Sequence, residues 1–173
     1  MTNMFSYCHS LTSLDVSSFD TSHVTRMSGM FSNCQSLKSL DVSNFNTSLT
    51  VNMIGMFSGC NSLTSLDVSN FDTKKVIDMS SMFSNCLSLT SLNLVNFDTG
   101  LVENMAMMFA MDSNLEFLDI SSFVTNNCSF FNIMFQGCYN LLVTLNSKKC
   151  ENLLYSLPDY VKINDVAKIF YNF

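Results

Sequence analysis

The 173-residue sequence lacks tryptophan and has a single proline, five glycines and two histidines. With so little proline and glycine, the chain holds no linker of the flexible type, and we expect no domain boundary before the repeats described below come to an end. Although 47% of the residues are hydrophobic, no stretch approaches the roughly 18 consecutive apolar residues of a membrane helix. The sequence therefore predicts no membrane span in this segment.

Basic residues are scarce as well. Residues 1–143 carry a net charge of −7 and residues 144–173 a net charge of +1, so that the whole chain is at −6. Such an acidic body repels phosphate groups, which clusters of Lys and Arg bind by releasing counterions. We therefore expect no nucleic-acid partner. The amino terminus has neither the basic start nor the apolar run of a signal peptide, so a secretion signal would lie upstream of this segment.

A repeat of 26 residues runs through most of the chain. A Met-Phe pair recurs at this interval, and a leucine, a second phenylalanine and a threonine keep the same spacing. Several independent columns in one register indicate units that stack, because one unit alone is too small to bury its apolar residues. The phenylalanines of the Met-Phe pairs are Phe5, Phe31, Phe57, Phe83, Phe109 and Phe135.

The apolar pattern changes its period within each unit. Leu40 and Val42 alternate with polar residues, which predicts a half-buried strand. The apolar residues from 24 to 34 recur at three- and four-residue spacing, which predicts a short helix capped by residues 19–22. The predicted fold class is an α/β solenoid: a leucine-rich-repeat-like, right-handed stack of six 26-residue strand-turn-helix units, with a parallel sheet on one face and a C-terminal cap.

The segments LDVSNFDT, at residues 66–73, and MFSNC, at residues 30–34, are the most characteristic parts of the unit. Through them, about residues 4–143 resemble the bacterial surface protein 26-residue repeat family, a branch of the BspA-like leucine-rich repeat surface proteins. This resemblance implies a leucine-rich-repeat-type fold, a cell-surface or secreted location, and a role in adhesion or partner binding. It implies no catalytic residue and no cofactor.

The two ends of the chain depart from the repeat. Residues 144–173 are predicted to form a C-terminal capping segment after a repeat domain of residues 1–143, because Thr144 and Asn146 stand where Leu and Val are expected. The first unit is predicted to expose apolar side chains and a strand edge, as in a segment of a longer array or a unit covered by a partner or second copy. The capping segment is predicted to hold a helix from Cys150 to Pro158 and a second helix, capped by Asn164, with Val166, Ile169, Phe170 and Phe173 on its apolar side.

Cysteine and histidine form no pattern of a catalytic or metal site, and we expect no catalytic residue, metal or cofactor. Cysteines recur in the 26-residue register, with Asp112 in one of the positions. We interpret them as buried free thiols, since neighbouring helices would lie about 8–10 Å apart, too far for a disulfide. A disulfide between Cys128 and Cys150 stays an open alternative. His9 and His23 are predicted to lie on the surface.

The outward side of the predicted strands carries the candidate partner-binding residues. Serine and aspartate recur there, Asn93 interrupts the aspartates, and Val95 and Phe117 add apolar groups. The aspartates have three interpretations: they bind cations, they attract a basic partner, or they accept hydrogen bonds from turn amides and hold the unit in shape. The candidate residues are Ser39, Asp41, Ser65, Asp67, Asn93, Val95, Phe117 and Asp119.

These observations favour two functions that need no catalysis. The first is a surface recognition or adhesion module that binds a protein or glycan on a host or neighbouring cell through the regular sheet face. The alternative is a structural spacer or array unit that self-associates end to end through its uncapped first unit.

Overall fold

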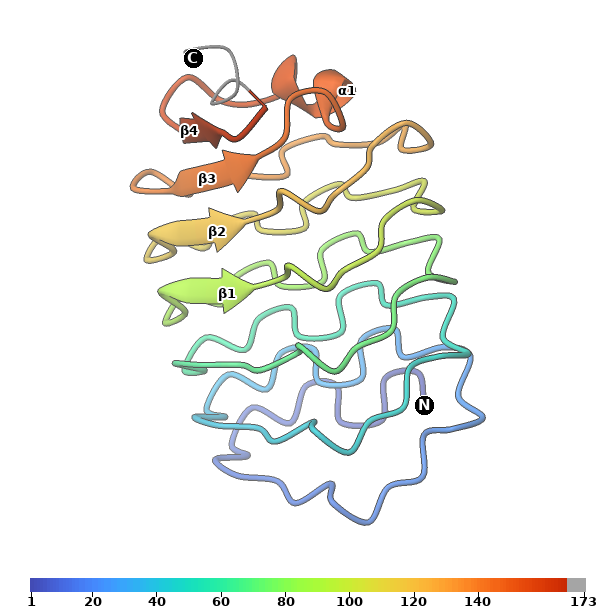
Figure 1. Ribbon diagram of the computed structural model, residues 1–173. Helices are drawn as coiled ribbons and strands as arrows, with labels where there is room; N and C mark the ends of the chain where they lie inside the picture. Colours follow the sequence, from blue (N-terminus) through green and yellow to red (C-terminus); the bar gives the residue numbers. More distant parts are fainter. Residues whose placement is uncertain (168–173) are drawn as a thin grey trace.

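The computed structural model describes residues 1–167. The chain winds into superposed turns, one for each 26-residue repeat, with the C-terminal segment at the opposite end from the N-terminus (Figure 1). We call residues 1–23 unit 1, and units 2 to 5 are residues 24–49, 50–75, 76–101 and 102–127. Unit 6 begins at residue 128.

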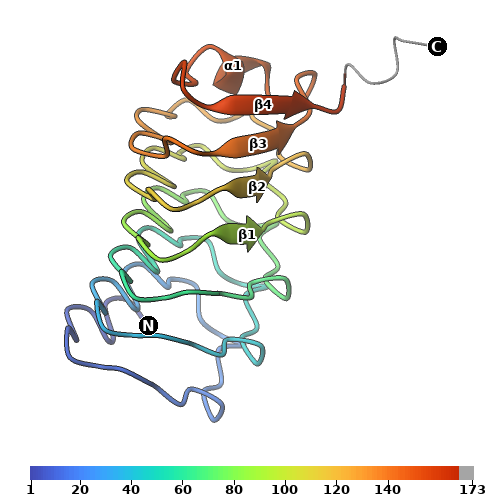
Figure 2. The same ribbon diagram turned by 90° about the vertical axis from the view of Figure 1, so that its left-hand side faces the viewer.

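Four short strands form one parallel sheet along one side of the stack, paired in sequence order (Figures 1 and 2). The first three belong to units 4, 5 and 6, and the fourth follows unit 6. The register sets Leu92 against Leu118, and Leu118 against Val143. The strands are β1 (Ser91–Asn93), β2 (Phe117–Asp119), β3 (Leu142–Leu145) and β4 (Lys162–Asp165).

The predicted sheet is thus present only in the C-terminal half of the described chain. The equivalent runs of units 1 to 3 lie under the sheet in Figure 2 but form no strands. Their backbone contacts are sparse: Lys38 N donates to Thr12 O at 3.4 Å, whereas Glu116 N donates to Thr90 O at 2.9 Å where the sheet begins. Without a continuous ladder of such bonds, an extended run is not a strand.

The prediction of strand-turn-helix units with helices along one side is wrong. Within residues 1–167 the only helix is α1 (Glu151–Leu154), which follows the repeats. Where helices were expected, alternate amides donate to the next unit instead: Gly29 N to Ile54 O at 2.7 Å and Phe31 N to Met56 O at 2.9 Å. An α-helix needs each amide to bond within its own segment, four residues back, so the two arrangements exclude each other.

The segment that replaces each helix is a run of tight turns, which we call the turn run. Intervening amides such as Ser32 N donate three residues back within the unit, to Gly29 O at 3.0 Å. Two residues of each unit, four apart, have a left-handed backbone, for instance Gly55 with φ +55° and Gly59 with φ +74°. Because the turns recur every four residues, they bury side chains at the same spacing as a helix would.

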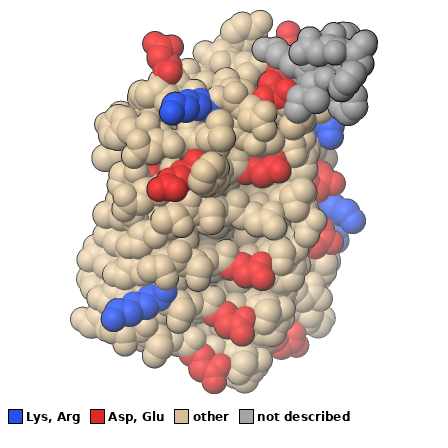
Figure 3. Space-filling model, turned by 60° about the vertical axis from the view of Figure 1, so that its left-hand side comes forward, with Lys and Arg blue, Asp and Glu red and all other residues tan. Residues whose placement is uncertain are grey.

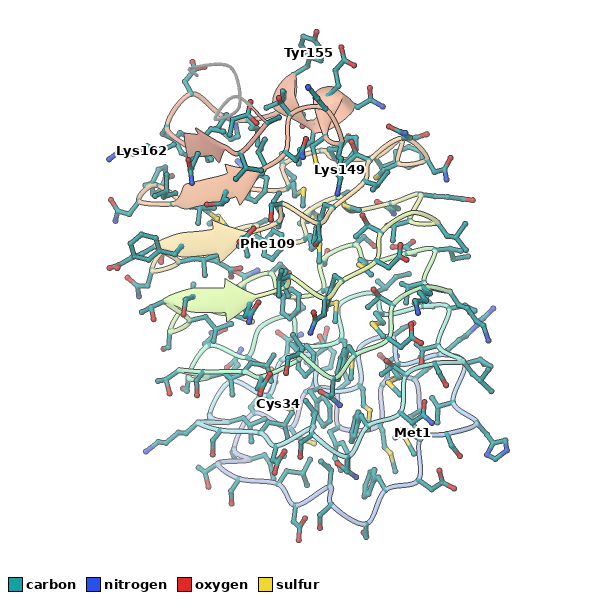
Figure 4. The ribbon with its side chains drawn as sticks, in the orientation of Figure 1. Met1, Cys34, Phe109, Lys149, Tyr155 and Lys162 are labelled. Carbon is teal, nitrogen blue, oxygen red and sulfur yellow. The ribbon has the colours of Figure 1, made fainter. Side chains whose placement is uncertain are left out.

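A column of phenylalanine rings fills the interior of the stack. The rings of Phe31 and Phe57 lie 5.7 Å apart between centroids, with an angle of 10° between their planes. This stacking continues through every unit from Phe5 to Phe135. Figure 4 shows Phe109 of this column inside the stack. The expectation that residues one repeat length apart lie over each other is confirmed.

Buried threonines join the units at the corner before the turn run. Thr47 is 1% exposed, and its Oγ1 donates to Asp72 O at 3.0 Å while accepting from Asp72 N at 2.8 Å. The same pair of bonds links Thr21 to the unit above it. A hydroxyl can act as donor and acceptor at once, so the corner has no unsatisfied polar group where an apolar residue of the same shape would leave two.

The cysteines are free, as expected, although the helices on which that expectation rested are absent from the described repeat units. Cys34, Cys60, Cys86, Cys128, Cys138 and Cys150 are buried, and Cys8 is exposed. In the column, each buried thiol donates to a carbonyl of the unit before it, as Cys60 Sγ does to Phe31 O at 3.3 Å. Cys128 and Cys150 form no disulfide.

The C-terminal segment continues the stack by a different route. Unit 6 has one residue fewer before its strand, so that Val143 and Leu145, rather than Thr144 and Asn146, are buried. The expectation that the unit loses its apolar pattern there is therefore wrong. The division at residue 143 stays a prediction.

The helix predicted from Cys150 is the short α1, which lies over the end of the stack (Figure 2). Tyr160 also covers this end, since its hydroxyl accepts from Gly137 N at 3.1 Å and donates to Phe135 O. Asn164 belongs to β4 and caps no helix among the described residues, and the expected positions Ile169, Phe170 and Phe173 lie outside them.

We expect that replacing Phe57 with alanine lowers the free energy of unfolding by about 3–5 kcal/mol, because its ring has neighbours above and below in the column. Urea denaturation followed by circular dichroism measures this loss. The exposed Phe117, replaced in the same way, is the matched control and should change stability by less than about 1 kcal/mol. Equal losses at both positions would contradict the stacked interior.

Candidate functional site

The outward residues of the strand runs make a flat surface along one side of the stack, which we call the strand face (Figure 3). In β2 the exposed Phe117 and Asp119 flank the buried Leu118. The register aligns Phe117 with Ser91, and Asp119 with Asn93. Two columns therefore cross the units: Ser13, Ser39, Ser65, Ser91, Phe117 and Leu142, and beside them Asp15, Asp41, Asp67, Asn93, Asp119 and Thr144.

The aspartates of the second column hold the turn that follows each strand run. Asp41 Oδ1 accepts from the amide of Ser43 at 2.9 Å, and Asp119 Oδ1 from the amide of Ser121 at 2.8 Å. The same bond recurs at Asp15 and Asp67, and Asn93 accepts from the amide of Val95 at 3.2 Å. The interpretation that these side chains accept hydrogen bonds from turn amides is confirmed.

These bonds also fix the charge of the strand face. The hydroxyl and then the amide of Ser69 lower the pKa of Asp67, and the corresponding serines lower the pKa of Asp15 and Asp41. These three aspartates therefore stay ionised over the physiological range. Figure 3 shows acidic side chains rising along this face. A lowered pKa adds stability that is complete above the ordinary value of 3.8 and is lost as the pH falls through the lowered value.

Two shallow depressions lie side by side on the strand face. The one of about 230 Å³ has Phe117 and Leu142 as apolar walls, with Asn93, Asp119 and Thr144 among its polar groups. The other, of about 390 Å³, is polar and includes Ser65 and Asp67. Ser91 and Asn93 line both, so the two form one continuous track across units 3 to 6.

The structure brings most of the predicted site residues together, but not all of them. Ser65, Asp67, Asn93, Phe117 and Asp119 line the track. Ser39 and Asp41 are exposed on the same face without lining it. Val95 is exposed, as predicted, but it lies beyond the end of β1 and lines neither depression. Phe117, 58% exposed, is the apolar residue of the track that was predicted correctly.

A second surface was missed from the sequence, along the turn runs of units 5 and 6. Phe130 is 54% exposed and, with Leu101, lines a depression there. Met107, Met111 and Ile133 are exposed and have left-handed backbones. In the sequence, this surface is indicated only by the change from Asn, Gly, Ser or Tyr in earlier units to Met and Ile in these positions. That change can be interpreted only when the left-handed backbone of the turn run is known.

Histidine and cysteine were the remaining candidates for chemistry. Both histidines are exposed, as predicted, and His23 Nδ1 lies 2.9 Å from Ser22 Oγ. No group of three or more His, Cys, Asp or Glu side chains among residues 1–167 is arranged to hold a metal ion. In the same range no helix has the length and apolarity to cross a bilayer.

Two overlapping stretches of the chain, residues 1–93 and 64–164, match the family described as Mycoplasma protein of unknown function, DUF285. The two matches share residues 64–93. Such an overlap arises when a family pattern that spans several units is matched to a chain of similar units. No curated protein and no solved structure matches the chain.

We expect that replacing Ser69 with alanine raises the pKa of Asp67, because the hydroxyl is the larger of the two contributions and the amide remains. The carboxyl ¹³C shift of Asp67, followed by NMR during an acid titration, measures the change. Ser65→Ala, on the same run but without a bond to Asp67, is the control. An unchanged pKa in the Ser69 variant would show that the hydroxyl bond does not form.

Proposed function

The chain belongs to the family described as Mycoplasma protein of unknown function, DUF285, and from that membership and the strand face we propose that it is a non-enzymatic recognition module. It binds a protein or glycan on a host or neighbouring cell. The track on the strand face is the contact surface. The location at the cell surface and the finer assignment to the BspA-like repeat proteins belong to this proposal, and the segments LDVSNFDT and MFSNC support them.

One observation carries the proposal: a large aromatic side chain is exposed where units 1 to 4 have serine. A ring that serves the interior is buried, as the rings of the phenylalanine column are from Phe31 to Phe135, whereas Phe117 is more than half exposed. Exposed aromatic residues ringed by polar groups are typical centres of binding surfaces. Here the polar groups are Asn93, Asp119 and Thr144, which line the same depression.

The rigidity of the strand face supports the same function. Leu118, between the two outward residues of β2, is buried in the core, and Asp119 is held by the amide of Ser121. The side chains of the track therefore have little freedom to lose when a partner binds, which favours affinity.

The test compares Phe117→Ser, which restores the residue found in units 1 to 4, with Phe130→Ser on the turn run. Each purified variant is applied to a glycan array and to a biotinylated surface-protein fraction of neighbouring cells. We expect Phe117→Ser to weaken the wild-type binding by roughly tenfold or more, and Phe130→Ser to leave it unchanged. Equal binding by wild type and Phe117→Ser would remove the track from consideration.

End-to-end self-association is the second candidate function, and Phe5 favours it. Among the described residues the aromatic column ends at this partly exposed ring, which stacks on Phe31 at 5.8 Å. Light scattering over a concentration series distinguishes the two functions. Growth into rods that Phe5→Asp abolishes would support stacking, and a monomer at all concentrations would exclude it.

A further inference from the structure

The cysteine column has one interruption, at Asp112 of unit 5. In the neighbouring units the thiols of Cys86 and Cys138 donate to the carbonyls of Phe57 and Phe109, at 3.2 and 3.0 Å. Each bond spans 29 residues. The corresponding carbonyl for residue 112 is that of Phe83. Asp112 is therefore placed where every neighbour in the column supplies a hydrogen-bond donor.

The contacts of Asp112 are incomplete in a specific way. Its side chain is 0% exposed, and Oδ1 accepts from Cys86 N at 2.7 Å. Oδ2 is buried and has no hydrogen-bond partner among the described residues. A carboxylate in this position would be a buried charge with a single hydrogen bond, which is a costly arrangement.

The carbonyl oxygen of Phe83 is a second buried polar group near Asp112 that lacks its usual hydrogen bonds. In the other units the amide of the column cysteine donates to the phenylalanine three residues before it, as Cys60 N does to Phe57 O at 3.2 Å. Asp112 draws Cys86 N away from that position, and no thiol replaces it. Within residues 1–167 the oxygen of Phe83 accepts no hydrogen bond, whereas that of Phe57 accepts from Cys60 N and from the Cys86 thiol.

We propose that Asp112 is a protonated carboxylic acid in the folded chain, that its Oδ2–H donates to the carbonyl of Phe83, and that loss of this proton loosens the contact between units 4 and 5. One proton satisfies both buried oxygens, because the neutral acid donates at Oδ2 while Oδ1 still accepts from Cys86 N. Asp112 then acts as the thiols do in the neighbouring units.

The surroundings keep the proton on Asp112. Burial raises its pKa to about 8, and the amide of Cys86 lowers it only partly. The titratable groups that face it are Cys86 in unit 4 and Cys138 in unit 6. Burial raises the pKa of Cys138 to about 12 and that of Cys86 well above its ordinary value, so both thiols stay neutral. Neither neighbour supplies a positive charge that would favour the carboxylate.

The dependence on pH follows from the two pKa values of this carboxyl. Below the ordinary value of 3.8 both folded and unfolded chains hold the proton, and Asp112 adds no pH dependence. Between that value and about 8 the unfolded chain releases the proton while the folded chain retains it, so stability falls as the pH rises. Above about 8 both states are ionised and the loss is complete.

The contact that weakens joins the same two units as the pairing of β1 with β2, which carries part of the track. Asp112 is in the same unit as β2, and the contact between units 4 and 5 includes the pairing of β1 with β2. Mildly alkaline conditions therefore act on the part of the stack that carries Phe117, without changing any residue of the strand face.

The experiment compares the wild type with Asp112→Asn. The asparagine accepts from Cys86 N and donates to Phe83 O without titrating, so it is a permanent form of the protonated acid. We expect the unfolding constant of the wild type to rise about tenfold for each pH unit between pH 5 and 8, relative to the variant. Urea denaturation at each pH measures it. Asp119→Asn is the exposed control and should keep the wild-type pH dependence.

A direct reading on the wild type keeps the proposal testable if the variant folds poorly. The carboxyl ¹³C shift of Asp112 should show the protonated form at pH 6 and change only near pH 8. The protection of the Cys86 amide, which is its exchange rate relative to the intrinsic rate at each pH, should fall over the same range. Titration of Asp112 near its ordinary value of 3.8 would overturn the proposal. So would identical pH dependence in the wild type and in Asp112→Asn.

Discussion

The fold depends on one constraint: in the turn runs, alternate amides hydrogen bond to the unit ahead rather than to their own unit. Met27, Gly29 and Phe31 donate in this way to residues 25 positions further along. These bonds fix the vertical alignment, and the alignment in turn sets the phenylalanine rings face to face and brings each threonine hydroxyl to the next corner. Helical bonding within a unit would have consumed the same amides and left the units without this connection.

The sequence was sufficient to predict which residues are buried and which superpose, because a 26-residue register leaves few other ways to cover so many apolar side chains. It was not sufficient to predict the backbone of the turn run. Apolar residues such as Met27, Met30 and Phe31 recur at three and four residues in a helix and equally in a series of four-residue turns. The difference lies in where the amides donate and in which residues have a left-handed backbone, and both depend on the three-dimensional structure.

The candidate site, too, could be predicted from the sequence only in part. The exposure of Phe117 and the column of aspartates follow from strand alternation, which holds along the whole face. That Asn93, Phe117 and Asp119 line one depression could be known only from the register of the strands. The sequence does not give this register reliably, since β3 is shifted by one residue in unit 6. Asp112 was visible in the sequence only as an exception in a column, since burial and the unpaired oxygen of its carboxyl depend on the units packed around it.

The left-handed residues of the turn runs bear on how the surface of this protein is shaped. A side chain with a β-carbon costs about 1–2 kcal/mol in that conformation, and Ile133, branched at that carbon, is among the least suited to it. Met107, Met111 and Ile133 are all exposed, so burial in the core does not compensate for this cost. Folding alone would favour glycine or asparagine at these points. The edge of units 5 and 6 therefore holds three side chains at a conformational cost that glycine would avoid.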